Sequence, residues 1–437
     1  MNNRFFDILV VGSGMGGMSS AAMLAKAGYR VLVTEKMPRI GGRCSTMDYK
    51  GFKCVTGVIG VETEGIVETF FNSVGAKFQV EPAGLPHYLI KKKVVKALPN
   101  GGMKRLLEAT GANPVSVEKI MSALSKALQW KEPSSGVTLY DWICQYSKHP
   151  GILSVFHTMV SATLMVNLNE LPAAHFFKFI KTLRGVNSFG YCPKGSSSLP
   201  DELGKVIQRC GGEIWTSSQV TQILTEKGVV QGALIQTQEK QFQINASAVI
   251  CNTGPLNTVE LAGDEHFDPD YLREIREKLR PSIVICLQFA LDEPLFEHNH
   301  LLVTGAKRVN AVYQPTIVCP GLATEGKHLL VVGASPASSI GPVEEKKEIE
   351  LCMKDLRRIF PEFDSHARIL ISGIYQGDWP GMHSWPGRDM PIKTPVINLY
   401  NVGDGVKESG YTGLPSAVKS GMMVSQEIMQ RIGIIET

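Results

Sequence analysis

Six residues near the start of the chain have the spacing of a loop that binds phosphate groups. The run Gly12-Ser13-Gly14-Met15-Gly16-Gly17 matches G-x-G-x-x-G, and Glu35 lies eighteen residues beyond its end. In such loops the first glycine permits a tight turn, the second lets the backbone approach a pyrophosphate, and the third lets a helix pack on a strand. The acidic residue accepts hydrogen bonds from ribose hydroxyls and disfavours a 2′-phosphate. The pattern therefore predicts a site for a dinucleotide other than NADP.

Further segments favour FAD over NAD as this dinucleotide. Lys36 and then Gly41-Gly42-Arg43 follow Glu35, and the glycine pair and the guanidinium would serve a longer ligand with two phosphates. Near the other end of the chain, Gly403 and Asp404 follow an apolar run. Ligand contacts lie at such strand ends in open α/β sheets, and Asp404 would accept hydrogen bonds from ribityl hydroxyls. Gly413-Leu414-Pro415 then opens a helix whose N-terminus can face a reduced flavin ring.

The order of the predicted elements is that of an α/β protein. A strand over 6–11, the glycine run, a helix over 19–26 and a strand over 31–34 form one strand–helix–strand unit. Helical periodicity dominates from 80 to 190, with helices predicted over 117–128, 138–142, 152–166 and 173–183. Strands are predicted over 213–215, 220–224, 229–237, 242–245, 249–251, 283–291, 310–318, 328–333, 368–375 and 396–402. Helices are also predicted over 200–210, 343–360 and 415–431.

Composition excludes several classes of protein. The chain has 437 residues, of which 43% are hydrophobic, and 45 basic against 41 acidic residues give a net charge of +4. That balance argues against binding to nucleic acid, and no stretch of about 20 apolar residues could span a bilayer. The nine cysteines form no Cys-x-x-Cys pair, which predicts reduced thiols in the cytoplasm and no metal site.

The run Lys91-Lys92-Lys93 with Lys96 predicts a solvated hairpin tip, and a contact with anionic lipid is the alternative.

These segments together resemble the flavin amine oxidase clan, and within it the phytoene desaturase-like branch of FAD-dependent oxidoreductases. The resemblance rests on residues 12–35, 41–43, 52–59, 191–195, 220, 252, 395–404 and 413–417. It implies noncovalent FAD in an extended form, with Gly57, Val58 and Ile59 over the flavin, Val220 near the adenine and Asn252 also in the cofactor site. Members of the clan that bind flavin covalently use Cys or His near the ring, and the surroundings of Tyr411 offer neither.

The resemblance also implies a fold of two interleaved domains. A Rossmann-like FAD-binding domain of the glutathione reductase type would comprise 1–80, 190–260 and 385–437. An α+β substrate domain with an antiparallel sheet would comprise 81–189 and 261–384. We therefore expect the α/β class, with the substrate held between the two domains.

The implied function is hydride transfer between flavin N5 and a small apolar substrate of prenyl or ring type. In such enzymes the cofactor supplies the reactivity, and the protein supplies orientation and a dry cavity. The electron donor or acceptor would be O₂, a quinone or a partner protein, because the sequence has no second G-x-G-x-x-G for NAD(P)H. The catalytic residues stay unknown, with Tyr411 and His383 as candidates, and the expected location is cytoplasmic, with peripheral membrane contact left open.

Two other functions remain open at this stage. Ser409-Gly410-Tyr411 is similar to a segment of monoamine oxidases, so Tyr411 and the aromatic residues of 379–385 could form a cage for an amine that is oxidised with O₂. A non-redox module that binds a prenyl lipid or escorts a prenylated protein could use the same fold. The bound flavin expected from Glu35 and Asp404 argues against this last alternative.

The helical stretches over 152–166 and 173–183 are rich in Phe and Met and permit two interpretations. They could be helix-packing core, or they could be the wall of an apolar cavity, because Met and Phe adapt to irregular ligands. The residues concerned are Phe156, Met159, Leu164, Met165, Phe176, Phe177 and Phe179. His298 and His300 are predicted to lie in a surface loop.

Overall fold

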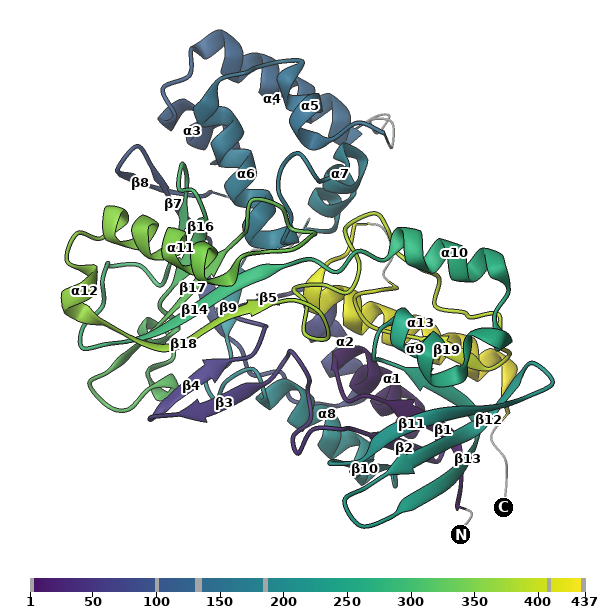
Figure 1. The fold of residues 1–437 in the computed structure, drawn as a ribbon. Coiled ribbons are helices and arrows are strands. Elements are labelled where there is room, and N and C mark those ends of the chain that lie inside the picture. Colours follow the sequence, from purple (N-terminus) through teal and green to yellow (C-terminus); the bar gives the residue numbers. More distant parts are fainter. Residues whose placement is uncertain (1–3, 99–101, 130–135, 184–187, 407–409, 434–437) are drawn as a thin grey trace.

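The computed structural model describes residues 4–98, 102–129, 136–183, 188–406 and 410–433, and these form a mixed α/β protein with two large sheets (Figure 1). The first sheet has the order β10-β2-β1-β13-β12-β11, and β19 also pairs with β13. Its strands are β1 (Arg4–Val11), β2 (Val31–Thr34), β10 (Glu213–Trp215), β11 (Gln219–Glu226), β12 (Val229–Gln236), β13 (Gln241–Cys251) and β19 (Leu399–Asn401). Strands β10, β2, β1, β13 and β19 run parallel, whereas β11 and β12 are antiparallel additions.

The predicted strand–helix–strand unit is confirmed, but its helix begins earlier than predicted. Helix α1 (Met15–Lys26) starts directly after Gly14, so Gly16 and Gly17 lie in its first turn rather than in a loop before residue 19. A Cβ atom on Gly17 would lie 2.3 Å from the carbonyl oxygen of Gly12. Gly16 and Gly17 therefore belong to the helix and not to the turn before it. They allow the helix to begin against the end of β1.

The strands predicted over 242–245 and 249–251 form one continuous strand, β13. Its first half pairs with β12, and its last three residues pair with β19 on the same side. The two halves look separate in the sequence because Ala246-Ser247-Ala248 interrupts the β-branched pattern between them. The predicted strand over 396–402 is correspondingly short in the structure, since only Leu399–Asn401 reach this edge.

Helices cover both faces of the first sheet. On one face α1 packs with α2 (Ile66–Val74), α8 (Ser198–Arg209) and α13 (Gly413–Arg431). On the other face lie α9 (Pro255–Ala262) and α10 (Pro269–Lys278). Helices α1 and α13 cross closely, because a Cβ atom on Gly421 would lie 2.6 Å from the carbonyl oxygen of Gly16. The last helix of the chain is thus packed on the first turn of the first helix.

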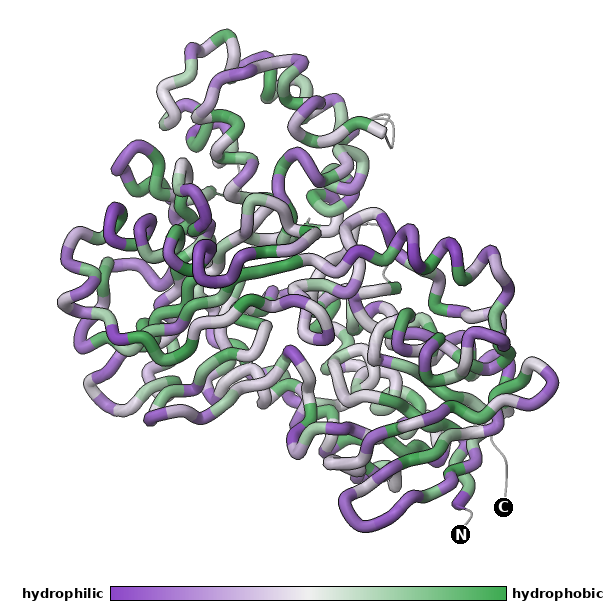
Figure 2. The backbone as a smooth tube through the Cα atoms, in the orientation of Figure 1, coloured by the Kyte–Doolittle hydropathy of each residue, from purple (hydrophilic) through white to green (hydrophobic). Residues whose placement is uncertain are grey.

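The second sheet has the order β18-β14-β17-β16-β15-β7-β8 and is antiparallel except for the β15–β7 pair. Its strands are β7 (His87–Ile90), β8 (Lys93–Lys96), β14 (Val284–Leu291), β15 (His300–Val303), β16 (Val309–Tyr313), β17 (His328–Ala334) and β18 (Ala367–Tyr375). Helices α11 (Glu345–Ile359) and α12 (Phe363–His366) cover one face. In Figure 2, α10 and α11 carry mostly hydrophilic residues on the outside of the molecule. Smaller sheets pair β3 (Thr46–Tyr49) with β4 (Phe52–Val55), and β5 (Val61–Thr63) and β6 (Glu81–Gly84) with β9 (Ser188–Tyr191).

Two predictions for this sheet are tested by the structure. The hairpin prediction is confirmed, because Lys91 and Lys92 lie exposed at the turn between β7 and β8. The surface prediction for His300 is wrong, because this residue starts β15 and is 6% exposed. Burial lowers the pKa of His300 to about 4, with a smaller contribution from His87 and His298, whose rings stack 3.8 Å apart. The tertiary pairing of β15 with β7 buries a segment that looks polar in the sequence.

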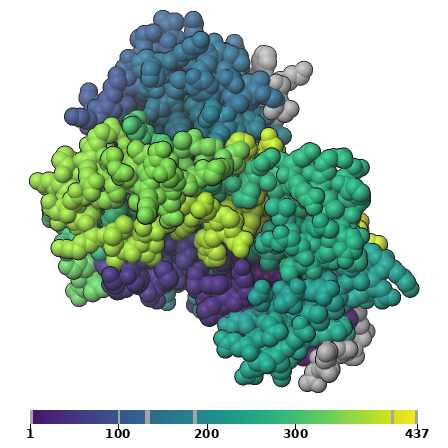
Figure 3. Space-filling model, in the orientation of Figure 1, coloured from purple at the N-terminus to yellow at the C-terminus, as the bar shows by residue number. Residues whose placement is uncertain are grey.

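Helices α3 (Gly102–Ala109), α4 (Pro114–Gln129), α5 (Leu139–Cys144), α6 (Pro150–Leu164) and α7 (Ala173–Thr182) form a lobe of their own, drawn in blue in Figure 3. Their Phe and Leu side chains, Phe156, Leu164, Phe176, Phe177 and Phe179, are buried in one shared core. Met159 packs against that core and is partly buried. For these six residues the helix-packing interpretation is right and the cavity-wall interpretation is wrong. Met165 alone of the set lines the cavity described below.

Thr138 caps helix α5 as the sequence predicts. Its hydroxyl accepts a hydrogen bond from the amide of Asp141 (3.1 Å) and donates to the carboxylate of Asp141 (2.7 Å). We expect Thr138→Ala to lower the free energy of unfolding by about 1 kcal/mol, because loss of the hydroxyl leaves the amide of Asp141 without its partner. Thr138→Ser keeps the hydroxyl and should unfold at nearly the wild-type denaturant concentration. Equal midpoints for wild type and Thr138→Ala would show that the cap contributes nothing.

The two large sheets divide the chain in the way that the predicted domains do. Strands of the first sheet come from ranges 1–80, 190–260 and 385–437, and strands of the second come from 81–189 and 261–384. The boundaries of the domains themselves stay a prediction.

Candidate functional site

A cavity of about 650 Å³ lies between the first sheet and the second. Its wall on one side comes from the end of β1, the start of α1, the end of β2 and the start of α13. Its wall on the other side comes from β14, β16, β17 and the end of β18, with the end of α6 beside them. The volume is within the range of small-molecule sites. The site therefore depends on both sheets and on segments from nearly the whole length of the chain.

The start of α1 presents backbone amides to this cavity. Gly12 has a φ of +92°, which a side chain would disfavour, and no side chain caps the helix at Gly14. The first amides of a helix have no partner within the helix. Here the amide of Gly17 donates instead to Oδ1 of Asn252 (3.1 Å). Met15 and Gly16 both line the cavity at this point. Such a helix start fits a phosphate group.

Glu35 lies at the end of β2 beside this turn and is 7% exposed. Its Oε2 accepts hydrogen bonds from the amide (3.0 Å) and hydroxyl (2.6 Å) of Ser13, and its Oε1 accepts one from the amide of Met37 (2.9 Å). A carboxylate has about four acceptor positions, so these three bonds leave capacity for a ribose hydroxyl. Lys36, Val220 and residues of α9 line the same end of the cavity.

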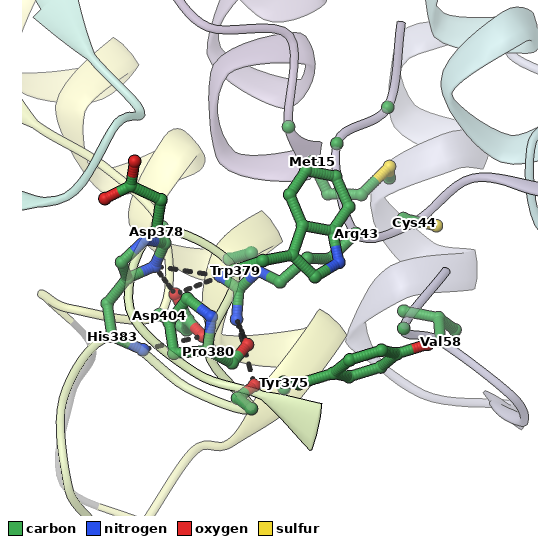
Figure 4. A pocket seen from close by; sticks show the side chains of 18 of the residues that line it. Met15, Arg43, Cys44, Val58, Tyr375, Asp378, Trp379, Pro380, His383 and Asp404 are labelled. Atoms are coloured by element: carbon green, nitrogen blue, oxygen red, sulfur yellow. Dashed lines mark hydrogen bonds and ion pairs between the residues drawn. The ribbon is translucent and has the colours of Figure 1, made fainter. Parts of the chain in front are cut away.

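Arg43, His383 and Asp404 form a cluster in the site, in which Asp404 is buried and the other two are partly exposed (Figure 4). Nη2 of Arg43 donates to Oδ1 of Asp404 (2.7 Å), and Nδ1 of His383 lies 2.8 Å from the same oxygen. Nη1 of Arg43 donates to the carbonyl oxygens of Pro380 (3.0 Å) and Gly381 (2.9 Å). In this structure the guanidinium thus joins the turn after β19 to the loop after β18.

The cluster keeps Asp404 ionised. Burial alone would raise the pKa of this carboxyl group, but the charges of Arg43 and His383 and their hydrogen bonds hold the pKa well below its usual range. Asp404 is 5% exposed. A fixed negative charge is therefore present at neutral pH where the chain returns to the cavity.

The loop that follows β18 closes the cavity from the side of the second sheet. Trp379 donates its indole N–H to the carbonyl oxygen of Thr56 (2.8 Å), and the loop also bonds with Ser282 through Gly381 and Met382. Figure 4 shows Trp379 and Tyr375 on the same side of the site as Arg43. The Tyr375 phenol stays protonated, because burial and the neighbouring Cys286 raise its pKa.

The structure brings most of the predicted cofactor residues together. The cavity is lined by Gly12, Gly14, Met15, Gly16, Glu35, Lys36, Gly42, Arg43, Gly57, Val58, Ile59, Val220, Asn252, Gly403, Asp404, Gly413 and Leu414, and by the candidate His383. Ser13, Gly17, Pro415 and the candidate Tyr411 do not line it. Ser13 and Gly17 instead support the lining residues through Glu35 and Asn252. Ser409 lies outside the described residues.

Sequence reasoning missed lining residues from the second sheet and from α9. These include Asn257 and Glu260 on α9, Cys286 on β14, Asn310 and Tyr313 on β16, and Tyr375 on β18. Tyr375 ends a strand that was predicted correctly, which could have marked it. Asn310 gives no sequence signal, because a single Asn in a β-branched run predicts nothing about a site.

The described residues contain neither a group of metal ligands nor a membrane-spanning helix. Among them, no three or more His, Cys, Asp or Glu side chains are grouped as metal ligands would be. In the same part of the chain, no helix has both the length and the apolar character that crossing a bilayer requires.

Comparison with known proteins identifies relatives of the whole chain. The sequence pattern of the family described as flavin containing amine oxidoreductases matches residues 15–429. An uncharacterised protein of Methanocaldococcus jannaschii is 25% identical over 411 residues, which cover 92% of this chain and 94% of that protein. Prolycopene isomerase of Daucus carota is 24% identical over 99% of this chain and 81% of its own length.

One further relative matches part of this chain, and one crystal structure matches nearly all of it. Human all-trans-retinol 13,14-reductase is 28% identical over 64% of this chain, and the match spans only about half, 54%, of that protein. The crystal structure of an oxidoreductase from Methanosarcina mazei superposes with a TM-score of 0.85 at 27% identity, covering 96% of this chain and 99% of that one.

Proposed function

Because the chain belongs to the family of flavin-containing amine oxidoreductases, we propose that this oxidoreductase holds FAD noncovalently and exchanges hydride with an apolar substrate. Because the chain belongs to this family, its cofactor is a flavin. When bound, the flavin supplies the hydride chemistry, and the protein orients the reactants and excludes water. The single observation that carries the proposal is the cavity itself, which has the helix start of α1 at one wall and an apolar sheet at the other.

The residues present fit the two ends of FAD. The amides of Met15 and Gly16 would hold phosphate, and Glu35 would hold the ribose of the adenosine half, beside Val220. Asp404 would accept hydrogen bonds from the ribityl chain while Arg43 keeps it ionised. Gly57, Val58 and Ile59 would lie against the flavin ring.

Noncovalent attachment is supported by the state of the nucleophiles that line the cavity. Burial raises the pKa of the Cys44 thiol well above its ordinary value, and burial raises that of Cys286 to about 12. A thiol rather than a thiolate is a poor nucleophile. Nδ1 of His383 is engaged with Asp404.

An apolar substrate is supported by the second wall of the cavity and by the relatives. Val284, Ile285, Ala311 and Ala334 line that wall. The named relatives are a prolycopene isomerase and an all-trans-retinol 13,14-reductase. We propose that electrons pass to or from an external partner, O₂, a quinone or another protein, and that the enzyme is cytoplasmic. If the enzyme contacts a membrane surface, we propose that the Lys-rich hairpin β7–β8 makes that contact.

Oxidation of amines is less well supported. The cage that it would need combines Tyr411, Trp379 and Trp385, and of these Trp379 alone lines the cavity. Trp385 is buried in another core and donates to Ser339 (3.0 Å). A non-redox escort function has no support in the family match.

The cofactor is tested by what the purified protein releases. We expect a yellow protein with a flavin absorption spectrum that releases FAD on denaturation in acid or guanidinium, since a noncovalent ligand leaves with the fold. Mass spectrometry of the filtrate identifies the released molecule. Release of FMN, NAD or nothing would overturn the noncovalent FAD proposal, and flavin that stays with the denatured protein would show a covalent bond.

A further inference from the structure

We propose that the cavity recognises a hydroxyl group at one end of its apolar ligand through the side chain of Asn310. This inference rests on the proposed function, which makes the cavity the substrate site. It narrows the substrate class to alcohols with a long apolar body. Strand β16 is irregular at Asn310, the Asn310 carboxamide makes one hydrogen bond, and the described part of the wall around it carries no charge.

Asn310 is the extra residue of a β-bulge. Between β16 and β17, Val309 pairs with Ala334 and Ala311 pairs with Gly333, so Asn310 has no partner in the ladder. Val309 and Val312 pack in the same core under α11 although they are three residues apart. An unbroken strand would turn them to opposite faces. Bulges near sites redirect side chains, and here Asn310 and its neighbour Ala311 both line the cavity.

The carboxamide of Asn310 has unused hydrogen-bonding capacity. Asn310 is 5% exposed, and its Nδ2 donates to Oγ of Ser335 (2.8 Å), which uses one of its two N–H groups. Among the residues that the structure describes, no donor bonds its Oδ1. Oδ1 is not among the buried side-chain atoms that lack a partner, so it is accessible from the cavity that Asn310 lines. An acceptor and a second donor therefore remain for a ligand.

The wall around Asn310 carries no charge in the described part of the chain. The other lining residues on β16, on β17 and at the end of α6 are all uncharged, namely Ser161, Ala162, Met165, Ala311, Tyr313, Gly333 and Ala334. The charged lining residues lie elsewhere, in the first-sheet half, on α9 and in the loop after β18. A ligand ammonium or carboxylate at this wall would be desolvated without an opposite charge. The end of the ligand that Asn310 contacts is therefore polar and neutral.

A hydroxyl group matches this amide better than other neutral groups do. A hydroxyl donates one hydrogen bond and accepts others, so it can use both Oδ1 and the second N–H group of Asn310. A ketone uses the donor only, and a hydrocarbon leaves both unpaired. Sites built to bond a hydroxyl discriminate against analogues that lack it, because the buried polar group is left without a partner.

The test compares matched ligands on wild type and one variant. The probes are geranylgeraniol and all-trans-retinol, each against the hydrocarbon that has a methyl group in place of its hydroxymethyl group. Equilibrium dialysis of the protein, with the flavin that it carries, gives the four affinities. We expect wild type to bind each alcohol about tenfold tighter than its hydrocarbon, because a neutral buried hydrogen bond contributes up to about 1.5 kcal/mol. In Asn310→Leu, which keeps the volume and removes the amide, the ratio should fall to one or below, because the hydroxyl is then buried without a partner.

Two further variants guard against indirect effects. Tyr140→Phe removes an exposed hydroxyl that does not line the cavity and should keep the wild-type ratio. Ser335→Ala leaves Asn310 in place but frees its amide to rotate, so it should lower the ratio by less than Asn310→Leu does. The Ser335→Ala ratio decides the question if Asn310→Leu does not fold. Equal affinity of wild type for alcohol and hydrocarbon in both pairs, or no binding of either alcohol, overturns the proposal.

Flavin content separates this inference from the proposed function. Asn310→Leu should retain as much flavin as wild type, because Asn310 lies on the second-sheet side of the cavity, away from α1. A protein that contains flavin but does not prefer alcohols would contradict the inference alone. A protein that prefers alcohols but contains no FAD would contradict the proposed function and leave the hydroxyl site standing.

Discussion

Gly14→Val is expected to give a folded protein that retains no flavin. A Cβ atom at this position would lie 2.2 Å from Nδ2 of Asn252, at the point where the backbone meets the cavity. The branched side chain would fill the space that a phosphate needs and would push Asn252 away from the amide of Gly17. Loss of that hydrogen bond should cost about 1 kcal/mol of stability. The measurement is flavin absorbance per protein together with the denaturant midpoint.

Two other glycines provide the controls for this variant. Gly136→Val lies in open space, with no atom within 4 Å of its Cβ, and should change neither flavin content nor stability. Gly17→Val should prevent folding, because its Cβ would lie 2.3 Å from the carbonyl oxygen of Gly12 and the backbone cannot yield there. Full flavin content in Gly14→Val would mean that the start of α1 does not bind the cofactor.

Asp404→Ala is expected to lower the free energy of unfolding by about 3 kcal/mol, the low end of the cost of breaking a buried ion pair, because the Arg43 side chain is 23% exposed. Arg43 would keep its charge with only carbonyl groups and His383 as neighbours, since its 2.7 Å bond with Asp404 is lost. The folded fraction should also retain flavin poorly. Lys53→Ala is the matched control, because its ion pair with Asp48 is exposed and should contribute less than about 1 kcal/mol.

The same carboxylate gives stability a particular dependence on pH. Its pKa is depressed in the folded protein, so its contribution is complete above the pKa of an unfolded Asp, about 3.9. The contribution is lost as the pH falls below that value towards the folded pKa. Wild type should therefore lose stability more steeply than Asp404→Asn when urea midpoints are compared from about pH 5 downward. Parallel curves for the two proteins would show that Asp404 is not held ionised by Arg43.

The first half of the site could be predicted because its geometry is local. Gly12, Gly14 and Glu35 belong to one strand–helix–strand unit, and short-range sterics fix their arrangement. Asp404 could be predicted to face the same ligand, because the carboxyl ends of parallel strands meet at one edge of a sheet. Its bond with Arg43 could not be predicted, since it joins residues 361 positions apart. Its bond with His383 could not be predicted either, since it depends on how the loop after β18 folds.

The second half of the site depends on long-range packing, and sequence reasoning failed there for physical reasons. Phe176 and Phe177 were assigned to either of two environments, because a cavity wall and a helix core demand the same apolar side chains. The structure buries both with Trp142, whose ring meets that of Phe177 edge-on at 4.9 Å. Asn310 reaches the cavity through a bulge that arises from the pairing of β16 with β17. Such a shift of register has no signal in a single strand.

The close crossing of α1 and α13 has a consequence for how the protein is made. Gly421 touches the first turn of α1, and β19, near the end of the chain, pairs with β13 in its middle. During synthesis the phosphate-binding turn leaves the ribosome long before Asp404 and α13 do. A nascent chain therefore exposes the apolar face of α1 until α13 has been synthesised and can cover it. Flavin would be captured only once Asp404 and α13 have emerged, and chaperones that shield apolar surface would act on the chain until then.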